Sequence, residues 1–483
     1  MKYPSARARG GWRTQRGTPD EIAGRAAPAG SLSFGGGRPQ FEVGLFAPPP
    51  ARHAGIKWSP LLIGFLAYVG VIVTYKFPIG DLMMAVALLG LLVQRDRIRV
   101  PTYLVLFALF VAWSAVGFLL SNYPQIVWDH LIDSVKVFLV ALVAANAIRT
   151  RPQLRVFVIF FLGCYALFPV RGALFNYFIS HYTLVGRAIW NYIYQNPNDL
   201  AALTLLQFSM AVGLTATEKP GWVRWAARAG IVVLPLLILL TQSRGAFIAL
   251  AAMIAMMIAV QRGRRVRLVA SILVVGAIVG SMIPSSAWQR FHGLTRATST
   301  SNLSQVDSEG SAKDRYAVWT VAFRIIASQP VFGVGVGAYP LAHNDYTIAS
   351  TDLTAGARGY RDTHSTYFNL AAEVGIPGLL LFLSMIGTTL LHAARARRAC
   401  AAVLPRAAAQ LLYLELGLFG YLVAGVFGSF AKLPFLYLHI TLIWASAEEC
   451  MHAAQSLTSP PGHDYPRHAG SSRRQLRGAW KSA

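Results

Sequence analysis

Long apolar runs recur along this chain from Trp58 to Trp444, and they constrain its fold more than any other feature. A hydrocarbon layer about 30 Å thick requires about 20 apolar residues from each helix that crosses it. The runs show no strict alternation of apolar and polar residues, which favours helices over the strands of a β-barrel. We therefore expect an all-α polytopic membrane protein with about twelve transmembrane helices. The expected helices centre near residues 67, 86, 111, 140, 166, 207, 235, 253, 275, 378, 417 and 439.

The positive charge of the chain, formally +24, is concentrated in particular loops. Arginine and lysine cluster after every even-numbered expected helix, for example Arg95, Arg97 and Arg99 after the second. Cytoplasmic loops of membrane proteins carry this excess of positive charge. The pattern accounts for the charge without a nucleic-acid partner, and it predicts that both termini are cytoplasmic.

The ends of the chain differ from its apolar middle. Residues 1–57 are rich in Arg, Gly, Pro and Ala, and we expect them to be a disordered basic extension of a membrane domain at 58–450. Residues 456–483 predict a disordered basic tail of the same kind. We expect the cysteines Cys400 and Cys450 to lie near the cytoplasmic face, where thiols stay reduced.

The longest outer loop is expected at residues 284–363, between the ninth and tenth helices. A polar stretch at 295–311 is followed by an expected amphipathic helix at 314–327, whose apolar residues recur at helical spacing: Tyr316, Trp319, Phe323 and Ile326. Three alternate glycines then follow at positions 333, 335 and 337. They indicate a tight turn or close backbone packing, and a phosphate-binding loop is the weaker alternative because no GKS/T follows.

Three residues with useful chemistry share the expected outer face: Arg187, Arg244 and His364. Arg244 interrupts a long apolar tract, and a charge at a bilayer centre costs roughly 2.5–3.5 kcal/mol, so a boundary or wet cavity is expected there. Two guanidinium groups could bind phosphate oxygens, and a histidine near neutral pH could act as a general base.

Structural roles are the alternative for each of these residues. Arg187 could anchor at the membrane interface, Arg244 could cap helix ends, and His364 could begin the tenth helix. Asn198 and Asp199 fit an N-cap and a first-turn acid of the sixth helix. The sequence contains no HExxH, DxD or Cys/His ligand spacing, so no metal and no other cofactor is expected.

The order of these features resembles the bacterial O-antigen ligase and polymerase family of membrane glycan transferases. The resemblance is clearest over residues 187–380 and is carried by four segments in order: Arg187 followed by Asn196-Pro197-Asn198-Asp199-Leu200-Ala201; Thr241-Gln242-Ser243-Arg244-Gly245-Ala246; Arg315, Trp319 and Pro330-Val331-Phe332-Gly333-Val334-Gly335; and His364-Ser365, nine residues, then Gly375-Ile376-Pro377-Gly378. The last segment fits the pattern H[NSQ]-x9-G-x-x-G.

The resemblance implies a GT-C-type fold in the bacterial inner membrane with the active site facing the periplasm. It implies inverting, metal-independent transfer of a glycan from undecaprenyl diphosphate to a hydroxyl of lipid A core, of another glycan or of a protein. Arg187 and Arg244 would bind the diphosphate and His364 would assist deprotonation of the acceptor, with Asn198, Asp199 and Arg315 as possible supporting residues.

The choice within this family stays open. The ligase subset is often described with an R-x3-L pattern, whereas position 248 here is Ile, which weakens ligation relative to polymerisation. Transfer to protein hydroxyls is a third variant. From other classes, a transporter of lipid-linked sugars also suits about twelve helices, although the largest loop falls far from the midpoint between two halves. A membrane scaffold would leave the Arg/His set unexplained.

Overall fold

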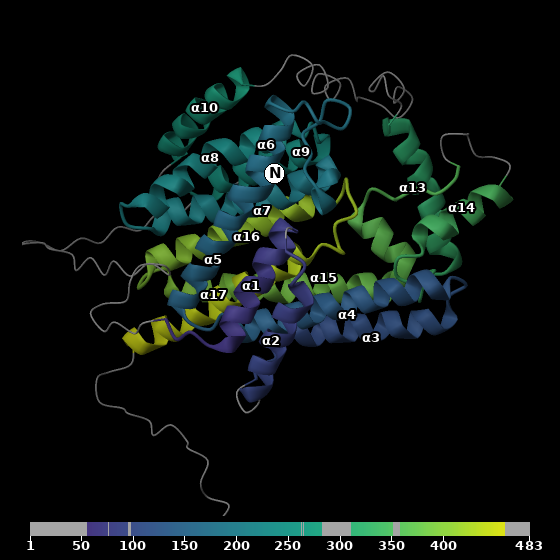
Figure 1. The fold of residues 1–483 in the computed structure, drawn as a ribbon, viewed down its shortest axis with the longest axis horizontal. Helices are drawn as coiled ribbons and strands as arrows, with labels where there is room; N and C mark the ends of the chain where they lie inside the picture. Colours follow the sequence, from purple (N-terminus) through teal and green to yellow (C-terminus); the bar gives the residue numbers. More distant parts are fainter. Residues whose placement is uncertain are drawn as a thin grey trace, which may run out of the picture. The chain divides into compact units, whose positions relative to one another are not determined.

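Figure 1 shows the chain as a computed structural model, which describes residues 56–75, 77–94, 98–261, 263, 265–282, 311–350 and 358–458. All described residues fall within the unit Phe41–Ala483. The regular structure of this part of the chain is helical, which confirms the expected all-α fold. The disordered segments expected at 1–57 and 456–483, and the polar stretch at 295–311, lie almost entirely outside the described residues.

The helices follow one another with short connections. In chain order they are α1 (Pro60–Thr74), α2 (Gly80–Val93), α3 (Thr102–Leu120), α4 (Pro124–Ala147), α5 (Arg151–Tyr165), the π-helix η2 (Ala166–Val170), α6 (Arg171–Phe178), the 3-10 helix η3 (Tyr192–Gln195), α7 (Pro197–Thr217), α8 (Trp222–Leu240), α9 (Arg244–Val260), α10 (Arg265–Ser281), α13 (Ser311–Ser328), α14 (Tyr339–Ala349), α15 (Thr366–Cys400), α16 (Pro405–Ala424) and α17 (Pro434–Thr458).

Each expected transmembrane centre falls inside one of these helices. By length and composition, 6 of the described helical segments are apolar and long enough to cross a membrane: Thr102–Leu120, Arg151–Phe178, Pro197–Thr217, Trp222–Leu240, Thr366–Cys400 and Pro405–Ala424. Shorter apolar helices are Pro60–Thr74, Gly80–Val93, Arg244–Val260 and Leu268–Ser281. The protein is therefore a polytopic membrane protein, and the count of about twelve spans and the GT-C assignment stay predictions.

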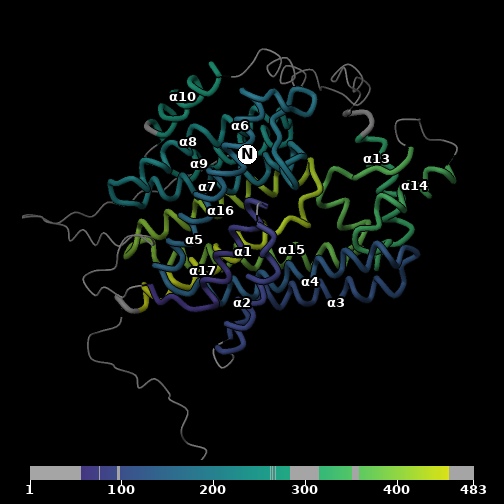
Figure 2. Tube along the Cα trace, in the orientation of Figure 1, coloured from purple at the N-terminus to yellow at the C-terminus, as the bar shows by residue number. Residues whose placement is uncertain are grey.

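The packing of two helices, α7 and α15, supports the candidate site. α7 packs between α8 and α16, and 83% of its apolar window is buried inside the protein. α15 packs against α3, α16 and α17, and the tube in Figure 2 shows it running beside α3. Asn198 lies in the first turn of α7, and His364 lies just before the N-cap of α15, so the packing of these two helices positions the site.

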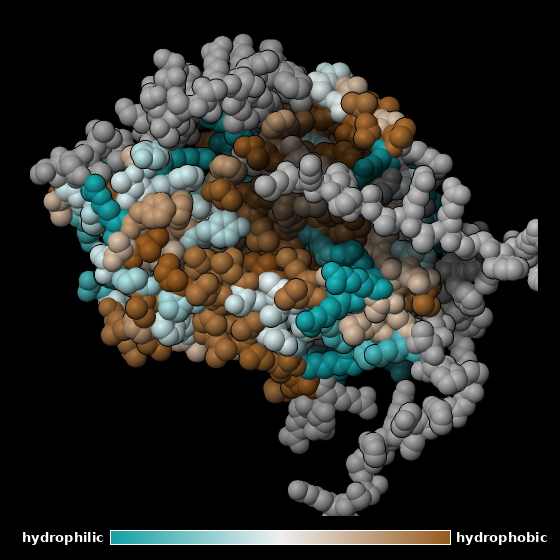
Figure 3. Space-filling view, turned by 180° about the vertical axis from the view of Figure 1, so that it is seen from behind, coloured by the Kyte–Doolittle hydropathy of each residue, from teal (hydrophilic) through white to brown (hydrophobic). Residues whose placement is uncertain are grey.

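The outer surface of the bundle is largely apolar, as a lipid environment requires. Figure 3 shows apolar residues gathered over a broad area of the face seen from behind. Large side chains stay exposed on the helices, including Leu119 at 77% and Val93 at 87%. In water such a surface would be an aggregation hazard, whereas lipid tails make it stable.

A kink in α15 explains the two glycine segments of the sequence. Gly375 has φ 70° and ψ 178°, which breaks the helical hydrogen bonding of α15. The carbonyls of Ala372 and Glu373, freed by the kink, accept from the amides of Val334 and Gly335 at 2.9 and 2.8 Å. A Cβ on Gly375 would collide with the carbonyl of Val331. The alternate glycines therefore make a tight turn with close backbone packing, as the sequence favoured.

The expected amphipathic helix of the outer loop is confirmed as α13, but its buried face differs from the prediction. The buried residues are Val318, Val321, Ala322 and Ile325, whereas Tyr316 and Phe323 are more than half exposed. Trp319 lies between the two faces and donates from Nε1 to the carbonyl of Thr363 at 2.8 Å. α14 was not predicted from the sequence.

The prediction of reduced thiols at the end of α15 is wrong in this structure. Cys400 and Cys450 form a disulfide with a Cα–Cα distance of 6.2 Å, joining α15 to α17. The two residues are 50 positions apart, and only the packing of α15 on α17 makes them neighbours. Spacing in sequence could not show that proximity.

Candidate functional site

Arg187 lies in a tight hairpin that is bonded to the turn before α9. Leu184 and Arg187 form a β-bridge around Val185 and Gly186, both of which have positive φ. The amide of Ala188 donates to the carbonyl of Leu240, and Gln242 donates from Nε2 to the carbonyl of Gly186, each at 2.9 Å. These bonds fix the hairpin against the segment that leads into Arg244.

The Arg187 side chain connects two segments that the sequence singled out. Its Nε donates to the carbonyl of Thr241 at 2.8 Å, and its Nη2 donates to Oδ1 of Asn198 at 2.8 Å. One guanidinium group therefore holds the turn before α9, which contains Thr241, and the first turn of α7 together. An interfacial anchor would need neither contact, so the structure gives Arg187 an internal role.

Arg244 is the first residue of α9, after the N-cap Ser243. A Cβ on its neighbour Gly245 would meet the ring of Phe427, so this end of α9 packs closely on the loop after α16. That loop continues into Gly428 and Ser429, which line the same cavity as His364. The start of α9 and the surroundings of His364 thus share one structural support.

His364 stands on a short segment that is joined to the same loop. The hydroxyl of Thr366 donates to the carbonyl of Gly428 at 2.7 Å and accepts from the amide of Phe430 at 2.9 Å. Ser429 donates from Oγ to Oδ1 of Asp362 at 2.9 Å. His364 itself has φ 49°, a conformation that non-glycine residues rarely adopt and that clusters at functional sites.

A cavity of about 220 Å³ brings together three of the six candidate residues, Asn198, Asp199 and His364, whereas Arg187, Arg244 and Arg315 are not part of its lining. It is lined by Asn196, Asn198, Asp199, Pro340, Asp362, His364, Asn369, Glu373, Gly428, Ser429, Phe430 and Lys432. Its ionisable groups other than the histidine are three carboxylates and one ammonium, and the ammonium of Lys432 lies 3.4 Å from the carboxylate of Glu373. Such a lining favours uncharged hydroxyl-bearing groups over phosphate inside the cavity.

The first turn of α7 differs from the expected arrangement in one respect. Asn196 is the N-cap, and its Oδ1 accepts from the amide of Asn198 at 2.9 Å. Asn198 is therefore not the cap; with Pro197 at the first helical position, the cap lies two residues earlier than the sequence suggested. Asp199 is a first-turn acid, as expected, and it also faces the cavity.

His364 has a carboxylate beside it and a pKa suited to accepting a proton. Its Nδ1 lies 3.5 Å from Oδ2 of Asp362, and its side chain is 43% exposed. Burial is the largest influence on the pKa of His364 and lowers it below the ordinary value of 6.5. Asp362 opposes this effect, and the charges of Arg315 and Arg361 lower the pKa further. The imidazole is thus neutral at pH 7 and can act as a base.

Arg315 belongs to the surroundings of His364, although it comes from α13. It is close enough to affect the imidazole through its charge. Trp319 fixes the position of α13 by its hydrogen bond to the carbonyl of Thr363, the residue before His364. The rings of Trp319 and Phe323 also contact the ring of Phe368, with centroid distances of 5.2 and 4.8 Å. The loop helix therefore presents its first turns to the site.

Three ionisable residues of the cavity escaped the sequence interpretation: Asp362, Glu373 and Lys432. Glu373 offered a usable signal, because an ionisable residue inside an apolar helix is by default a functional candidate. It is fully buried, and its Oε2 has no hydrogen-bond partner among the described residues. Asp362 precedes His364 by two positions in the sequence. Nothing in the sequence indicates that Lys432 lies near Asp362 or Glu373. No group of three or more His, Cys, Asp or Glu among the described residues is placed to hold a metal ion.

Comparison with known proteins agrees with these features. Residues 229–383 match the protein family described as O-antigen ligase. No curated protein matches the chain. The matched segment includes Arg244, Arg315 and His364, whereas Arg187 and Asn198 lie before it. Residues 229–383 are therefore an O-antigen ligase-like region of the chain.

Proposed function

We propose that this protein transfers a glycan from a polyprenyl diphosphate, such as undecaprenyl diphosphate, to an acceptor hydroxyl at the periplasmic face of the bacterial inner membrane. The observation that carries the proposal is the cavity in which His364 and its partner Asp362 face Asn198, the residue that Arg187 holds. Arg187 is one hydrogen bond away from the cavity that His364 lines, which supports a base and a diphosphate-binding arginine acting at neighbouring positions. The proposal also places both termini of the chain in the cytoplasm.

The acceptor and the donor headgroup would occupy different parts of the site. The carboxylates of Asp199, Asp362 and Glu373 repel a diphosphate but accept hydrogen bonds from sugar hydroxyls. The acceptor hydroxyl would therefore lie in the cavity. The diphosphate would lie toward Arg187 and Arg244, whose guanidinium forks match phosphate oxygens.

The reaction that this arrangement supports is a single displacement with inversion. His364 removes the proton from the acceptor hydroxyl while its oxygen attacks the anomeric carbon. The bond from that carbon to the diphosphate breaks, and its electron pair leaves with the diphosphate. A positioned base contributes typically about 10²–10⁴-fold. Arg187 and Arg244 stabilise the charge that collects on the leaving group, and no metal or other cofactor takes part.

An apolar groove offers a place for the donor's lipid chain. A cavity of about 690 Å³ lies between α5, η2 and α6 on one side and α8 on the other, lined by residues such as Leu162, Phe175, Ala226 and Val233. The groove is linked to the hairpin that contains Arg187, because Asn176 of α6 donates from Nδ2 to the carbonyl of Ile189 at 3.1 Å. A chain held there would bring its headgroup toward Arg187.

Ligation to lipid A core is our first proposal for the acceptor, with polymerisation of lipid-linked glycans and transfer to protein hydroxyls as alternatives. The three share the donor half-reaction and differ only in the molecule that supplies the hydroxyl. Ile248, which replaces the leucine of the ligase pattern, is the residue that most favours polymerisation.

A reconstituted assay tests the proposal. The purified protein in lipid nanodiscs is supplied with a polyprenyl-diphosphate glycan and, in separate reactions, with lipid A core, with a second lipid-linked glycan, or with an acceptor protein. We expect transfer to lipid A core in the presence of EDTA, and loss of transfer in His364→Ala. Transfer by that variant at the wild-type rate would overturn the catalytic assignment. Loss of activity in EDTA that a divalent ion restores would overturn the metal-free mechanism, and product in either other reaction would identify the acceptor.

A further inference from the structure

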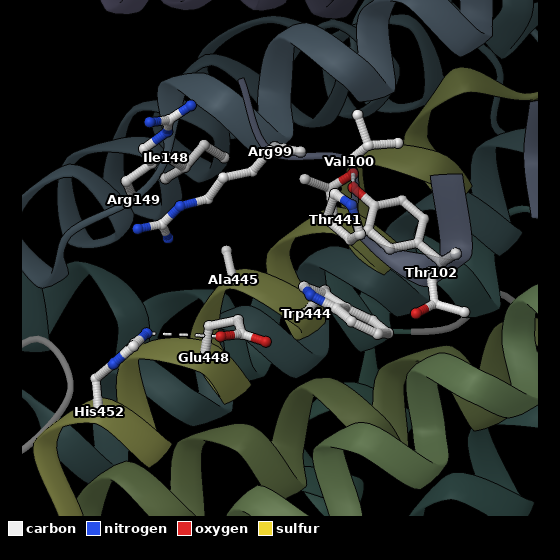
Figure 4. A pocket seen from close by; sticks show the side chains of 13 residues that line it. Arg99, Val100, Thr102, Ile148, Arg149, Thr441, Trp444, Ala445, Glu448 and His452 are labelled. Atoms are coloured by element: carbon white, nitrogen blue, oxygen red, sulfur yellow. Dashed lines mark hydrogen bonds and ion pairs between the residues drawn. The ribbon is translucent and has the colours of Figure 1, made fainter. Parts of the chain in front are cut away.

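A second polar cavity lies at the opposite end of the helix bundle from His364. Its volume is about 500 Å³, and it is formed by the start of α3, the end of α4 and the middle of α17 (Figure 4). α3 separates it from the glycine-rich turn: Thr102 lies at the cavity, whereas Ser121, after the other end of α3, donates from Oγ to the carbonyl of Val334 at 2.6 Å. A helix of 19 residues is about 28 Å long, so the two cavities are separate sites.

Basic side chains stand on one side of this cavity. Figure 4 shows the guanidinium of Arg99 pointing into the space between Arg149 and His452. Among the described residues, no hydrogen bond or ion pair holds that guanidinium, although the Arg99 backbone is fixed by Asn146 at 2.8 and 3.1 Å. Arg149 donates to the same asparagine. Asn146 thus holds both arginines in place while the fork of Arg99 faces open space.

The acid in the cavity does not cancel this charge. Glu448 lies 3.0 Å from Nε2 of His392 and 3.7 Å from Nε2 of His452, so its two oxygens already face ring nitrogens. The neighbouring Glu449 lies 3.5 Å from Nε of Arg151. An anion that enters the cavity would therefore find Arg99 available.

The remaining wall is apolar and aromatic. Trp444 stacks on His392 at 4.1 Å between ring centroids and lies 5.4 Å from Tyr103. Val100, Ile148 and Ala445 complete this wall. A purely ionic ligand would use only half of such a cavity, whereas an amphiphile with a phosphate at one end would use both halves.

We propose that this cavity binds a phosphate group, and that its preferred source is the headgroup of an anionic phospholipid. Arg99 would provide the fork-shaped contact to the phosphate oxygens, Arg149 and His452 would flank it, and the Trp444 wall would contact the start of the lipid chains. Basic pockets between transmembrane helices bind lipid headgroups in this way. The inference does not depend on the proposed glycan transfer.

Direct titration of the purified, delipidated full-length protein tests the inference. Three probes are compared: dioctanoyl phosphatidylglycerol, inorganic phosphate, and dioctanoylglycerol, which lacks phosphate. We expect the phosphatidylglycerol to bind the wild type, and Arg99→Ala to weaken that binding by about tenfold or more, as the loss of a charge-assisted hydrogen bond predicts. Arg398→Ala is the matched control, because it removes an exposed arginine from the end of α15 without touching the cavity.

The three probes separate the outcomes. Tighter binding of the phospholipid than of inorganic phosphate, both dependent on Arg99, identifies a lipid headgroup as the ligand. Equal Arg99-dependent binding of inorganic phosphate identifies a soluble phosphate compound. The inference is overturned if Arg99→Ala binds both phosphate probes as the wild type does, or if dioctanoylglycerol binds as tightly as the phospholipid. Glycan transfer by Arg99→Ala should equal that of the wild type.

Discussion

Arg187 donates a hydrogen bond from Nη2 to Oδ1 of Asn198 at 2.8 Å, across 11 positions of sequence. The same guanidinium donates from Nε to the carbonyl of Thr241. Arg187 thus determines the distance between the first turn of α7, which faces the cavity, and the turn that carries Arg244. A group that binds a diphosphate and also sets the spacing of the site is hard to replace by another cation.

The variant Arg187→Lys should therefore be impaired in glycan transfer, although it keeps the positive charge. A lysine ammonium is a point charge on a flexible stem and cannot reproduce the two directed bonds of the guanidinium fork. We expect kcat/KM for glycan transfer to fall by about tenfold or more, as the loss of one charge-assisted hydrogen bond predicts. The same change at the exposed Arg398 serves as the control. Wild-type kinetics in Arg187→Lys would mean that charge alone suffices at this position.

The pH dependence of transfer should report the imidazole of His364. Burial lowers the pKa of His364 below 6.5, so the neutral base predominates at pH 7 and the rate should fall only as the pH drops below 6.5. Asp362 acts in the opposite direction and raises this pKa. Asp362→Asn should therefore move the acid limb of the kcat/KM profile to lower pH.

A pH–rate profile of both proteins measures this shift. An acid limb that stays in place in Asp362→Asn, or moves to higher pH, would show that another group controls it. Asp133 lies outside the cavity and is mostly exposed, so Asp133→Asn is the control for a general effect of charge.

The sequence predicted the elements of the fold better than their contacts. Apolar runs are local, so each expected span centre lies in a helix, and the helix at 314–327 is present as α13. Its buried face was predicted wrongly, because the aromatic stripe faces Phe368 and the surface rather than the interior. Which face of a helix is buried depends on the elements that pack against it, and the sequence of that helix alone does not identify them.

The same distinction applies to the candidate site. His364, Arg187 and Arg244 could be selected from the sequence because polar residues are conspicuous at the ends of apolar runs. Lys432 could not be selected, because its proximity to Glu373 depends on the loop between α16 and α17 folding back onto α15. The disulfide of Cys400 and Cys450 was missed for the same reason.

Gly375 should be one of the least replaceable residues of α15. Its φ of 70° is unfavourable for a residue with a side chain, and a Cβ would meet the carbonyl of Val331. Gly375→Ala should therefore destabilise the protein by more than about 1 kcal/mol, because left-handed backbone strain and a steric clash add. Thermal unfolding in detergent measures the effect.

Gly387 provides the matched control within the same helix. A Cβ there meets nothing within 4 Å, and helical alanine is favoured over glycine by roughly 0.5–1 kcal/mol. Gly387→Ala should therefore leave the unfolding temperature unchanged or raise it. Equal unfolding temperatures for Gly375→Ala and the wild type would contradict the role given to the kink.

Filling the apolar groove between α6 and α8 should impair use of the lipid-linked donor. Ala226 lines this groove, and Ala226→Trp would place a large ring where we propose that the polyprenyl chain lies. The chemical groups near His364 stay intact, so the KM for the donor should rise several-fold while the KM for the acceptor stays the same. Ala255→Trp on the exposed side of α9 adds the same ring outside the groove and should leave both values unchanged.

Kinetics with a donor carrying a shortened lipid chain complete the test: the short chain should lessen the difference between Ala226→Trp and the wild type. An undiminished difference would place the lipid chain elsewhere on the protein.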